Sequence, residues 1–403
     1  MEAMREPAAE WAAAQPDMAG LRVALFSGNY NYTRDGANQA LNRLVSYLLA
    51  HGAAVRVYSP TTATPAFEPA GDLVSVPSLP IPGRGEYRVA LGLPRRLRED
   101  IRAFAPTVIH LSAPDLLGLQ ARNFGRALGI PVVSSIHTRF ETYLAYYGLG
   151  WLQARAERYL AGFYGGCDAL LPPNAQMGQL VTEQAPGAQV RVWPRGVDRE
   201  QFSPRRRSAA WRSAAGLGPD EVAVLFLGRV VQEKGLVVLA ETFARLQGKV
   251  RPVIVGDGPA RGWLESHLPG AIFTGFLTRT ALAEAVASTD LIFNPSLTET
   301  FGNATLEAMA AGLPVIAPRA PSTDNLIRHG REGLVVETPD AASYVDAILR
   351  LAEDPELRGQ MGRAACETSR RFDWDACCAR VVAAYREFGG WPAAAAPGAN
   401  VGT

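Results

Sequence analysis

Short apolar runs alternate with amphipathic stretches along most of the chain, and the alternation comes in two series. This pattern is typical of parallel sheets whose strands are joined by crossover helices. The runs predicted as strands are Leu21–Ser27, Ala54–Tyr58, Val108–Leu111, Val132–Ile136 and Ala169–Leu171, then Val222–Leu227, Pro252–Val255, Ala271–Thr274, Leu291–Asn294, Val315–Ala317 and Leu334–Val336. We therefore predict an α/β fold with two Rossmann-like, doubly wound domains that face each other across a cleft.

The alternation is interrupted between Pro194 and Pro204, which predicts a domain boundary there. The predicted parts are, in order, a disordered extension (1–20), an N-terminal Rossmann-like domain (21–195), a C-terminal Rossmann-like domain (196–372), a closing helix (373–390) and a disordered tail (391–403). Residues 60–85 are rich in Pro and Gly, and we interpret them as a long loop.

Opposite charges nearly balance, because 40 Lys and Arg residues accompany 39 Asp and Glu residues. Without a strong positive field, the chain is not expected to bind nucleic acid. No apolar run approaches the roughly 18 residues that span a bilayer. The four cysteines form no C-x-x-C pair, which favours a reduced, cytoplasmic protein. The Asp-x-Asp pair Asp373 and Asp375 lies beside the predicted closing helix, so we interpret it as structural and predict no metal site.

Ligands of doubly wound folds bind at the carboxyl ends of the strands. The strongest candidate there is Ser296–Met309, where a strand ends and a helix begins near Gly302. A helix N-terminus offers free N–H groups, and glycine lets a ligand approach them. Glu299 precedes the helix, and Glu307 stands inside it among apolar residues, where sugar hydroxyls are suitable partners for a costly carboxylate. The alternative makes Glu299 a helix-dipole partner and Glu307 a solvated residue.

A second candidate is Gly228–Gly235, which follows a strongly apolar strand. Arg229 and Lys234 place two cations on this loop, and a guanidinium fork with an ammonium suits a diphosphate. Lys234 is one of only two lysines in the chain. The alternative is a surface ion pair between Lys234 and Glu233.

Glycine-bearing loops follow two other predicted strands. Gly256 belongs to a tight turn that we expect to line the cleft, although a dinucleotide fingerprint is not met because Gly262 comes one place late. The long polar loop after the first strand makes Asp35 and Gly36 the favoured ligand contacts, with an ordinary flexible loop as the alternative.

Two histidines belong to strands of the first series. His137 ends the strand Val132–Ile136 and is therefore predicted to face the cleft. His110 stands inside an apolar strand and is interpreted as structural.

A basic stretch with interleaved apolar residues runs from Arg84 to Phe104. Such a segment suits an anionic membrane surface. A solvated helix face is the alternative interpretation.

Together these motifs resemble glycosyltransferase family 4 over roughly residues 21–390. The most specific part is Glu299–Gly312, accompanied by Gly228–Gly235 and Gly256–Pro259. The form Glu-Thr-Phe-Gly-Asn, with Asn303 where many members have Leu, resembles a clade of bacterial mannosyltransferases and glycolipid-forming, sulfoquinovosyl-type transferases. Arg195 departs from the family pattern, in which Asn is common.

The resemblance implies the two-domain GT-B architecture, with an acceptor-side N-terminal domain and a C-terminal domain that binds a nucleotide sugar. It also implies roles for individual residues. Arg229 and Lys234 would hold the diphosphate, Glu307 would bind the ribose, and Glu299 would bind the sugar. Gly256 would line the site, Leu277 would meet the base through its backbone, and the backbone around Phe301, Gly302 and Asn303 would hold sugar and phosphate. From the N-terminal domain, His137 would contact the transferred sugar and Gly36 would approach the diphosphate.

The function that this resemblance implies is a retaining hexosyltransferase that uses a nucleotide sugar and a lipid-linked or saccharide acceptor. Fixed cations and a helix N-terminus can stabilise the departing diphosphate, so we expect neither a metal nor a further cofactor. We expect a cytoplasmic protein that is either free or peripheral at the inner face of the membrane. A nucleotide-sugar epimerase of similar fold and a non-catalytic nucleotide-sugar-binding protein are the alternatives.

Overall fold

The computed structural model describes residues 17–33, 35–81, 84–137, 150–389 and 391. The chain divides into two compact units. The first unit comprises Met1–Pro194 and Trp374–Thr403, and the second comprises Arg195–Asp373. The helix at the end of the chain therefore belongs to the first unit.

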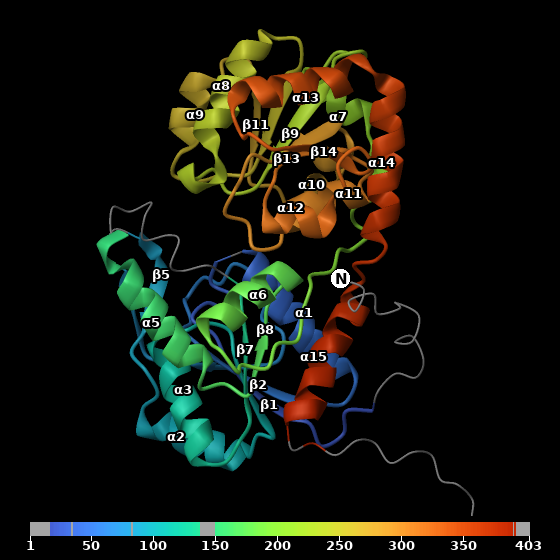
Figure 1. The fold of residues 1–403 in the computed structure, drawn as a ribbon. Coiled ribbons are helices and arrows are strands. Elements are labelled where there is room, and N and C mark those ends of the chain that lie inside the picture. Colours follow the sequence, from blue (N-terminus) through green and yellow to red (C-terminus); the bar gives the residue numbers. More distant parts are fainter. Residues whose placement is uncertain (1–16, 34, 82–83, 138–149, 390, 392–403) are drawn as a thin grey trace, which may run out of the picture. The chain divides into compact units, whose positions relative to one another are not determined.

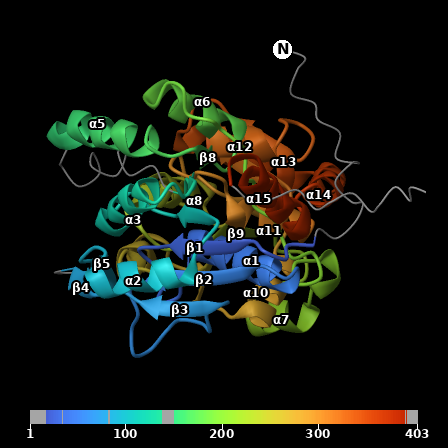
Figure 2. The same ribbon diagram turned by 90° about the horizontal axis from the view of Figure 1, so that it is seen from below.

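The first unit contains a six-stranded parallel sheet with the order β3-β2-β1-β6-β7-β8. Figure 2 shows β1, β2 and β3 side by side. The strands are β1 (Arg22–Phe26), β2 (Ala54–Ser59), β3 (Asp72–Ser75), β6 (Val108–Leu111), β7 (Val132–Ser135) and β8 (Ala169–Leu171). Strands β6, β7 and β8 are buried along their whole length, so the polar side chains of His110, Ser134 and Ser135 lie inside the unit.

Helices connect these strands and cover the sheet (Figure 1). They are α1 (Gly36–Ala50), α2 (Arg95–Phe104), α3 (Leu116–Ala127), α5 (Gln153–Tyr164), α6 (Ala175–Gln184) and α15 (Trp374–Phe388). Helix α15 packs against α1 and β8, and its buried face includes Cys377, Cys378 and Tyr385. The last helix thus completes the core of the first unit.

The predicted loop over residues 60–85 is wrong, because three strands lie wholly or partly within it. Strand β3 adds to the edge of the main sheet, and β4 (Ser78–Ile81) pairs antiparallel with β5 (Arg84–Ala90). The pair β4–β5 is a separate two-stranded sheet. Such a pair tolerates proline in a strand, as at Pro80, because one side of each strand needs no hydrogen-bond partner. The Pro-rich composition therefore concealed these strands.

The described ends of the chain are packed, in contrast to the predicted disorder of 1–20 and 391–403. Met18 is fully buried, and its backbone N–H donates to the carbonyl of His51 over 2.9 Å. Trp391 is buried as well, and its indole N–H donates to the Ala19 carbonyl over 3.1 Å. Burial of these large apolar side chains accounts for the order. The rest of both predicted segments, 1–16 and 392–403, lies outside the described residues.

The second unit repeats the first sheet with the order β11-β10-β9-β12-β13-β14, again all parallel. Its strands are β9 (Ala223–Leu227), β10 (Arg251–Val255), β11 (Ile272–Gly275), β12 (Leu291–Phe293), β13 (Val315–Pro318) and β14 (Gly333–Val336). Its helices are α7 (Ala209–Ala214), α8 (Leu236–Leu246), α9 (Arg261–His267), α10 (Arg279–Ala287), α11 (Asn303–Ala310), α12 (Pro321–Leu326), α13 (Ala341–Glu353) and α14 (Pro355–Ser369). The predicted class, two Rossmann-like α/β units, is confirmed.

Candidate active site

The strand order of each sheet reverses at one point, and ligands of open α/β sheets bind there. In the second unit the reversal lies between β9 and β12, which are paired neighbours. The loops that follow these strands are 228–235 and 294–302, and they carry Arg229, Lys234 and Glu299. Topology thus brings the two strongest sequence motifs to the same edge of one sheet.

Direct contacts join these two loops. The Lys234 ammonium donates a hydrogen bond to Glu299 Oε1, and both side chains are largely buried. The Thr298 hydroxyl donates to the Glu233 carbonyl over 3.1 Å. Lys234 therefore pairs with Glu299 rather than with Glu233, which was the alternative drawn from the sequence.

Gly235 shows how closely the loops approach each other. Its φ of +76° favours glycine, and a Cβ there would lie 2.9 Å from the Pro295 carbonyl oxygen. Thr298 belongs to the candidate motif Ser296–Met309 but was given no role of its own, and Pro295 was not predicted as part of the site. Pro295 directly precedes that motif, which is the signal that the sequence offers for it.

Arg229 lies on an exposed turn that rests on the neighbouring loop, 256–259. The Val230 N–H donates to the Asp257 carbonyl, and the Ala260 N–H donates to the Val230 carbonyl. A Cβ on Gly256 would lie 1.9 Å from the Gly228 carbonyl oxygen. Gly256 is therefore required for loop packing beneath Arg229, whatever it contributes to a ligand.

The N-terminus of α11 presents unsatisfied backbone groups. Gly302 precedes the helix with a φ of +94°, and no side chain caps the first turn. Asn303 begins the helix, and its buried Oδ1 has no hydrogen-bond partner among the described residues. The Phe301 ring is buried against Phe372 with ring centroids 5.8 Å apart, so only its backbone remains for a ligand.

Glu307 lies in the middle of α11, between the buried side chains of Leu306 and Ala308. Its carboxyl group is half-buried and makes no hydrogen bond with the described residues. Burial raises the pKa of Glu307 from 4.5 to about 8. The group is therefore mostly protonated at neutral pH, and a ligand with hydroxyl groups would supply the partners that the protein does not.

Leu277 follows β11 in the connection to α10. The preceding Gly275 has a φ of +67°, and the Leu277 side chain packs against the core of the unit. Its side chain is therefore engaged in the core, and the contact of its backbone with the base, which the resemblance implies, stays a prediction.

Gly36 and Asp35 stand at the start of α1 in the first unit. Asp35 caps the helix, and its Oδ1 accepts hydrogen bonds from the backbone N–H groups of Ala37 and Asn38 over 2.9 Å each. Asp35 was predicted as a ligand contact, but capping engages its carboxylate. Gly36 is the first residue of the helix, where backbone groups are accessible.

His137 follows β7 at the carboxyl edge of the first sheet. Its Nε2 lies 2.8 Å from the hydroxyl oxygen of Ser135, and its ring meets the edge of Trp193 with centroids 5.7 Å apart. Ser135 and Trp193 were not predicted. The spacing of two between Ser135 and His137 was the available signal, because such residues share a face of an extended strand.

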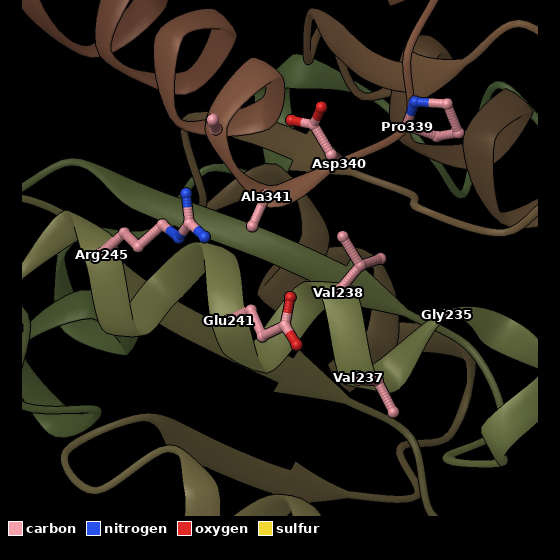
Figure 3. Close-up of a pocket in the computed structure, with 9 residues that line it drawn as sticks. Gly235, Val237, Val238, Glu241, Arg245, Pro339, Asp340 and Ala341 are labelled. Atoms are coloured by element: carbon pink, nitrogen blue, oxygen red, sulfur yellow. The ribbon is translucent and has the colours of Figure 1, made fainter.

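A separate hollow of about 640 Å³ lies between α8 and the start of α13 (Figure 3). Its charged lining residues are Glu241, Arg245 and Asp340. Asp340 caps α13 by accepting a hydrogen bond from the Ser343 backbone N–H over 2.8 Å. None of the residues predicted to bind the donor or to act in catalysis lines this hollow.

Comparisons with known proteins point to one family. The model described as "Glycosyltransferase Family 4" matches residues 34–201, and "Glycosyl transferases group 1" matches residues 221–354. The sulfoquinovosyl transferase SQD2 of Arabidopsis thaliana is 32% identical over 370 residues, which cover 89% of this chain and 72% of that protein. A GDP-mannose-dependent alpha-mannosyltransferase of Corynebacterium glutamicum is 30% identical over 374 residues, covering 91% and 89%.

Among solved structures, sucrose-phosphate synthase from Thermosynechococcus elongatus superimposes with a TM-score of 0.74 at 21% identity. The match covers 91% of this chain and 98% of that one. This likeness supports the fold. Nothing in the comparisons supports an epimerase.

Proposed function

The chain belongs to glycosyltransferase family 4, and we propose that it moves a hexose from a nucleotide sugar to a lipid-linked or saccharide acceptor in glycolipid or cell-envelope glycan synthesis. The observation that carries the proposal is the ion pair between Lys234 and Glu299 at the strand-order reversal of the second unit, with Arg229 on the same loop as Lys234. By their names, these two relatives transfer a sulfoquinovosyl group and, with GDP-mannose, a mannosyl group, and a further relative from Streptococcus pneumoniae is named as an alpha-monoglucosyldiacylglycerol synthase.

The donor's diphosphate is the group that the two loops suit best. Breaking the bond between the anomeric carbon and the phosphate leaves negative charge on the departing diphosphate. The guanidinium of Arg229, the ammonium of Lys234 and the uncapped N-terminus of α11 stabilise that charge. We therefore propose transfer that needs no metal ion and no cofactor beyond the donor itself.

Hydroxyl groups of the donor account for the acidic residues. Glu299 holds Lys234 in place in the free protein and, in the proposed complex, turns its carboxylate to sugar hydroxyls. Glu307 and the unpartnered Oδ1 of Asn303 are acceptors for further hydroxyls. Each of these buried groups gains a partner that the described protein does not provide.

We propose that the reaction retains the anomeric configuration by a front-face route. The anomeric carbon–phosphate bond breaks, the acceptor oxygen bonds to the same face of the carbon, and the acceptor's proton passes to a phosphate oxygen of the leaving group. The family resemblance assigns Gly36 to the diphosphate and His137 to the transferred sugar, and the proposal keeps both assignments.

Lys234→Ala tests this proposal most directly, with Lys249→Ala as the matched control because Lys249 is an exposed lysine of the same unit. Donors and acceptors are first screened with the wild-type protein, using UDP- and GDP-hexoses. Loss of a fixed charge-stabilising donor costs about 10²–10³-fold in kcat, so Lys234→Ala is expected to lose at least 100-fold. Turnover within threefold of wild type would contradict the assignment. Donor binding without turnover on any acceptor would favour the non-catalytic alternative.

We also propose that the protein contacts a membrane surface, and an exposed apolar surface of the first unit supports this. Leu79 and Val89 are cross-strand partners in the β4–β5 hairpin and are 58% and 50% exposed, and Leu91 is 52% exposed. The exposed Arg95 and Arg96 begin α2 four residues later. Apolar side chains beside cations suit the surface of an anionic bilayer. No helix in the described ranges is long and apolar enough to cross a membrane.

We propose that this hairpin holds the protein peripherally at the inner face of an anionic membrane, where a lipid-linked acceptor is found. Sedimentation with phosphatidylglycerol vesicles at low salt is the test. The double variant Leu79→Glu, Val89→Glu is expected to lose binding, whereas Leu128→Glu, an exposed leucine elsewhere in the unit, retains it. Wild-type binding should weaken with salt. Absence of wild-type sedimentation at low salt would refute this part of the proposal.

A further inference from the structure

Four side chains of the first unit form a line of hydrogen bonds that ends at His137. The Tyr385 hydroxyl lies 2.5 Å from His110 Nδ1, and His110 Nε2 lies 2.8 Å from the Ser135 hydroxyl. The same Ser135 hydroxyl lies 2.8 Å from His137 Nε2. Three elements far apart in the sequence, α15, β6 and β7, therefore meet behind His137.

The line is shielded from water over most of its length. Tyr385 and His110 are fully buried, and Ser135 is nearly so. The fully buried Trp193 places its ring edge-on to both imidazoles, 6.0 Å from His110 and 5.7 Å from His137 by ring centroids. Burial raises the pKa of Tyr385 well above its ordinary value, so the phenol keeps its proton.

The Tyr385 proton decides the direction of the hydrogen bonds. No hydrogen bond of the Tyr385 hydroxyl other than the one to His110 is found within the described ranges. If His110 donated to Tyr385, the phenol proton would be buried without an acceptor, which costs about 1–3 kcal/mol. Tyr385 therefore donates to His110 Nδ1, and the neutral His110 carries its proton on Nε2 and donates to Ser135.

The Ser135 hydroxyl can donate its one proton to either of two acceptors. His137 Nε2 lies 2.8 Å away, whereas the Leu111 carbonyl oxygen lies 3.4 Å away. If His137 donated from Nε2 instead, the Ser135 proton would be left with the long and weak contact to the Leu111 carbonyl. His137 accordingly accepts at Nε2, and its neutral ring carries the proton on Nδ1.

We propose that Tyr385, His110 and Ser135 are positioning residues that fix His137 as the Nδ1–H tautomer, so that it donates a hydrogen bond from Nδ1 to an oxygen of the transferred sugar. The hydrogen bond to the sugar rests on the proposed function, whereas the tautomer does not. Ser135 and Tyr385 were given no role at the site from the sequence, and His110 was interpreted as structural. The structure gives all three a task at the site.

Nitrogen-15 NMR of the full-length protein labelled in histidine tests the tautomer, with His137 assigned by its loss in His137→Ala. The wild-type spectrum is expected to show protonated Nδ1 and unprotonated Nε2. Ser135→Ala removes the donor to Nε2, so the signal should shift toward the Nε2–H form. Ser134→Ala is the matched control, because Ser134 is an adjacent buried serine whose hydroxyl has no partner among the described residues. A wild-type ring protonated on Nε2, or an unchanged spectrum in Ser135→Ala, would overturn the proposal.

Tyr385→Phe is a second variant that keeps the ring packing. Without the phenol proton the direction is no longer imposed, so a mixture of His137 tautomers is expected, and retention of pure Nδ1–H would contradict the role of Tyr385. Once a substrate pair is known, Ser135→Ala should lower kcat roughly tenfold, which corresponds to one hydrogen bond. It should cause no further loss in a His137→Ala background. If no substrate pair gives turnover, the proposed function fails while the NMR result still decides the tautomer.

Discussion

Glu307→Gln should have opposite effects on stability and on nucleotide binding. The carboxyl group of Glu307 lies inside α11 without a hydrogen-bond partner among the described residues, and burial raises its pKa from 4.5 to about 8. A glutamine has nearly the same shape and never ionises. The substitution therefore removes the cost of burying this carboxylate while preserving the packing.

The direction in which stability changes with pH follows from the protons bound by the folded and the unfolded chain. Below pH 4.5 the carboxyl is protonated in both folded and unfolded chains and contributes nothing to pH dependence. Between pH 4.5 and about 8 the unfolded chain has released the proton and the folded chain has not, so stability falls by up to about 1.4 kcal/mol per pH unit. Above pH 8 the loss is complete, with an upper limit of about 5 kcal/mol over this interval. The group is only half-buried, so we expect ~2–5 kcal/mol.

Urea unfolding of the full chain at pH 5, 7 and 9, followed by circular dichroism, measures this difference. Glu307→Gln should lie within about 1 kcal/mol of wild type at pH 5 and exceed it by ~2–5 kcal/mol at pH 9. Glu241→Gln replaces an exposed glutamate of α8 and should track wild type at every pH. Parallel stability profiles for wild type and Glu307→Gln would refute the raised pKa.

Glu307→Gln should weaken nucleotide binding, because in the proposed complex the ionised Glu307 accepts hydrogen bonds from ribose hydroxyls. At pH 7 about nine-tenths of the free protein carries the proton, so binding of UDP or GDP should release close to one proton. Calorimetry in buffers of different ionisation enthalpy measures that release. Glu307→Gln should abolish it and weaken binding roughly tenfold. Proton release that persists in the variant would show that another group titrates.

Two further substitutions test the architecture of the second unit. The buried Glu332 accepts hydrogen bonds from Arg328 and Thr368, and these bonds outweigh the effect of burial and lower its pKa. Because the Arg328 side chain is 56% exposed, Glu332→Gln leaves no buried charge and should cost about 1–3 kcal/mol of unfolding free energy at pH 7. The difference should shrink as pH falls below about 4.5. A difference that grew on acidification would contradict this. Gly256→Ala would place a Cβ against the Gly228 carbonyl oxygen at a φ of +136°, so it should lower the free energy of unfolding by at least about 2 kcal/mol. The control Gly262→Ala adds a Cβ in open space on α9 and should be neutral or stabilising. Equal thermal midpoints for the two variants would refute the packing argument.

The fold and the loops of the second unit could be predicted because each signal is local. A continuous apolar run predicts a buried parallel strand, and a glycine directly after it predicts a tight turn. Gly228 and Gly256 both follow strands in this way. The reversal of strand order then places such loops together, as β9 and β12 do with Lys234 and Glu299. Local patterns plus one topological rule were sufficient.

The wrong predictions concern segments whose structure depends on contacts that are not local in the sequence. Pro80 argues against a strand in the interior of a sheet, but a two-stranded hairpin leaves unpaired edges that tolerate it. Met18 and Trp391 occur in segments whose composition predicts disorder, yet both bury their side chains against residues distant in the sequence. Pairing at a sheet edge decided the first outcome and tertiary burial the second, and composition carries no information about either.

The positioning residues behind His137 show the same limit at the site itself. Most residues proposed to contact a ligand occupy loops, where glycine and charge mark them in the sequence. Residues that orient those contacts occupy strands and helices, where Ser135 and Tyr385 serve the core as well as the site. Because α15 returns to the first unit, Tyr385 reaches His110 across 275 positions of the chain. A substitution in the last helix can therefore alter the hydrogen bonding of a strand-end histidine while leaving every recognisable motif intact.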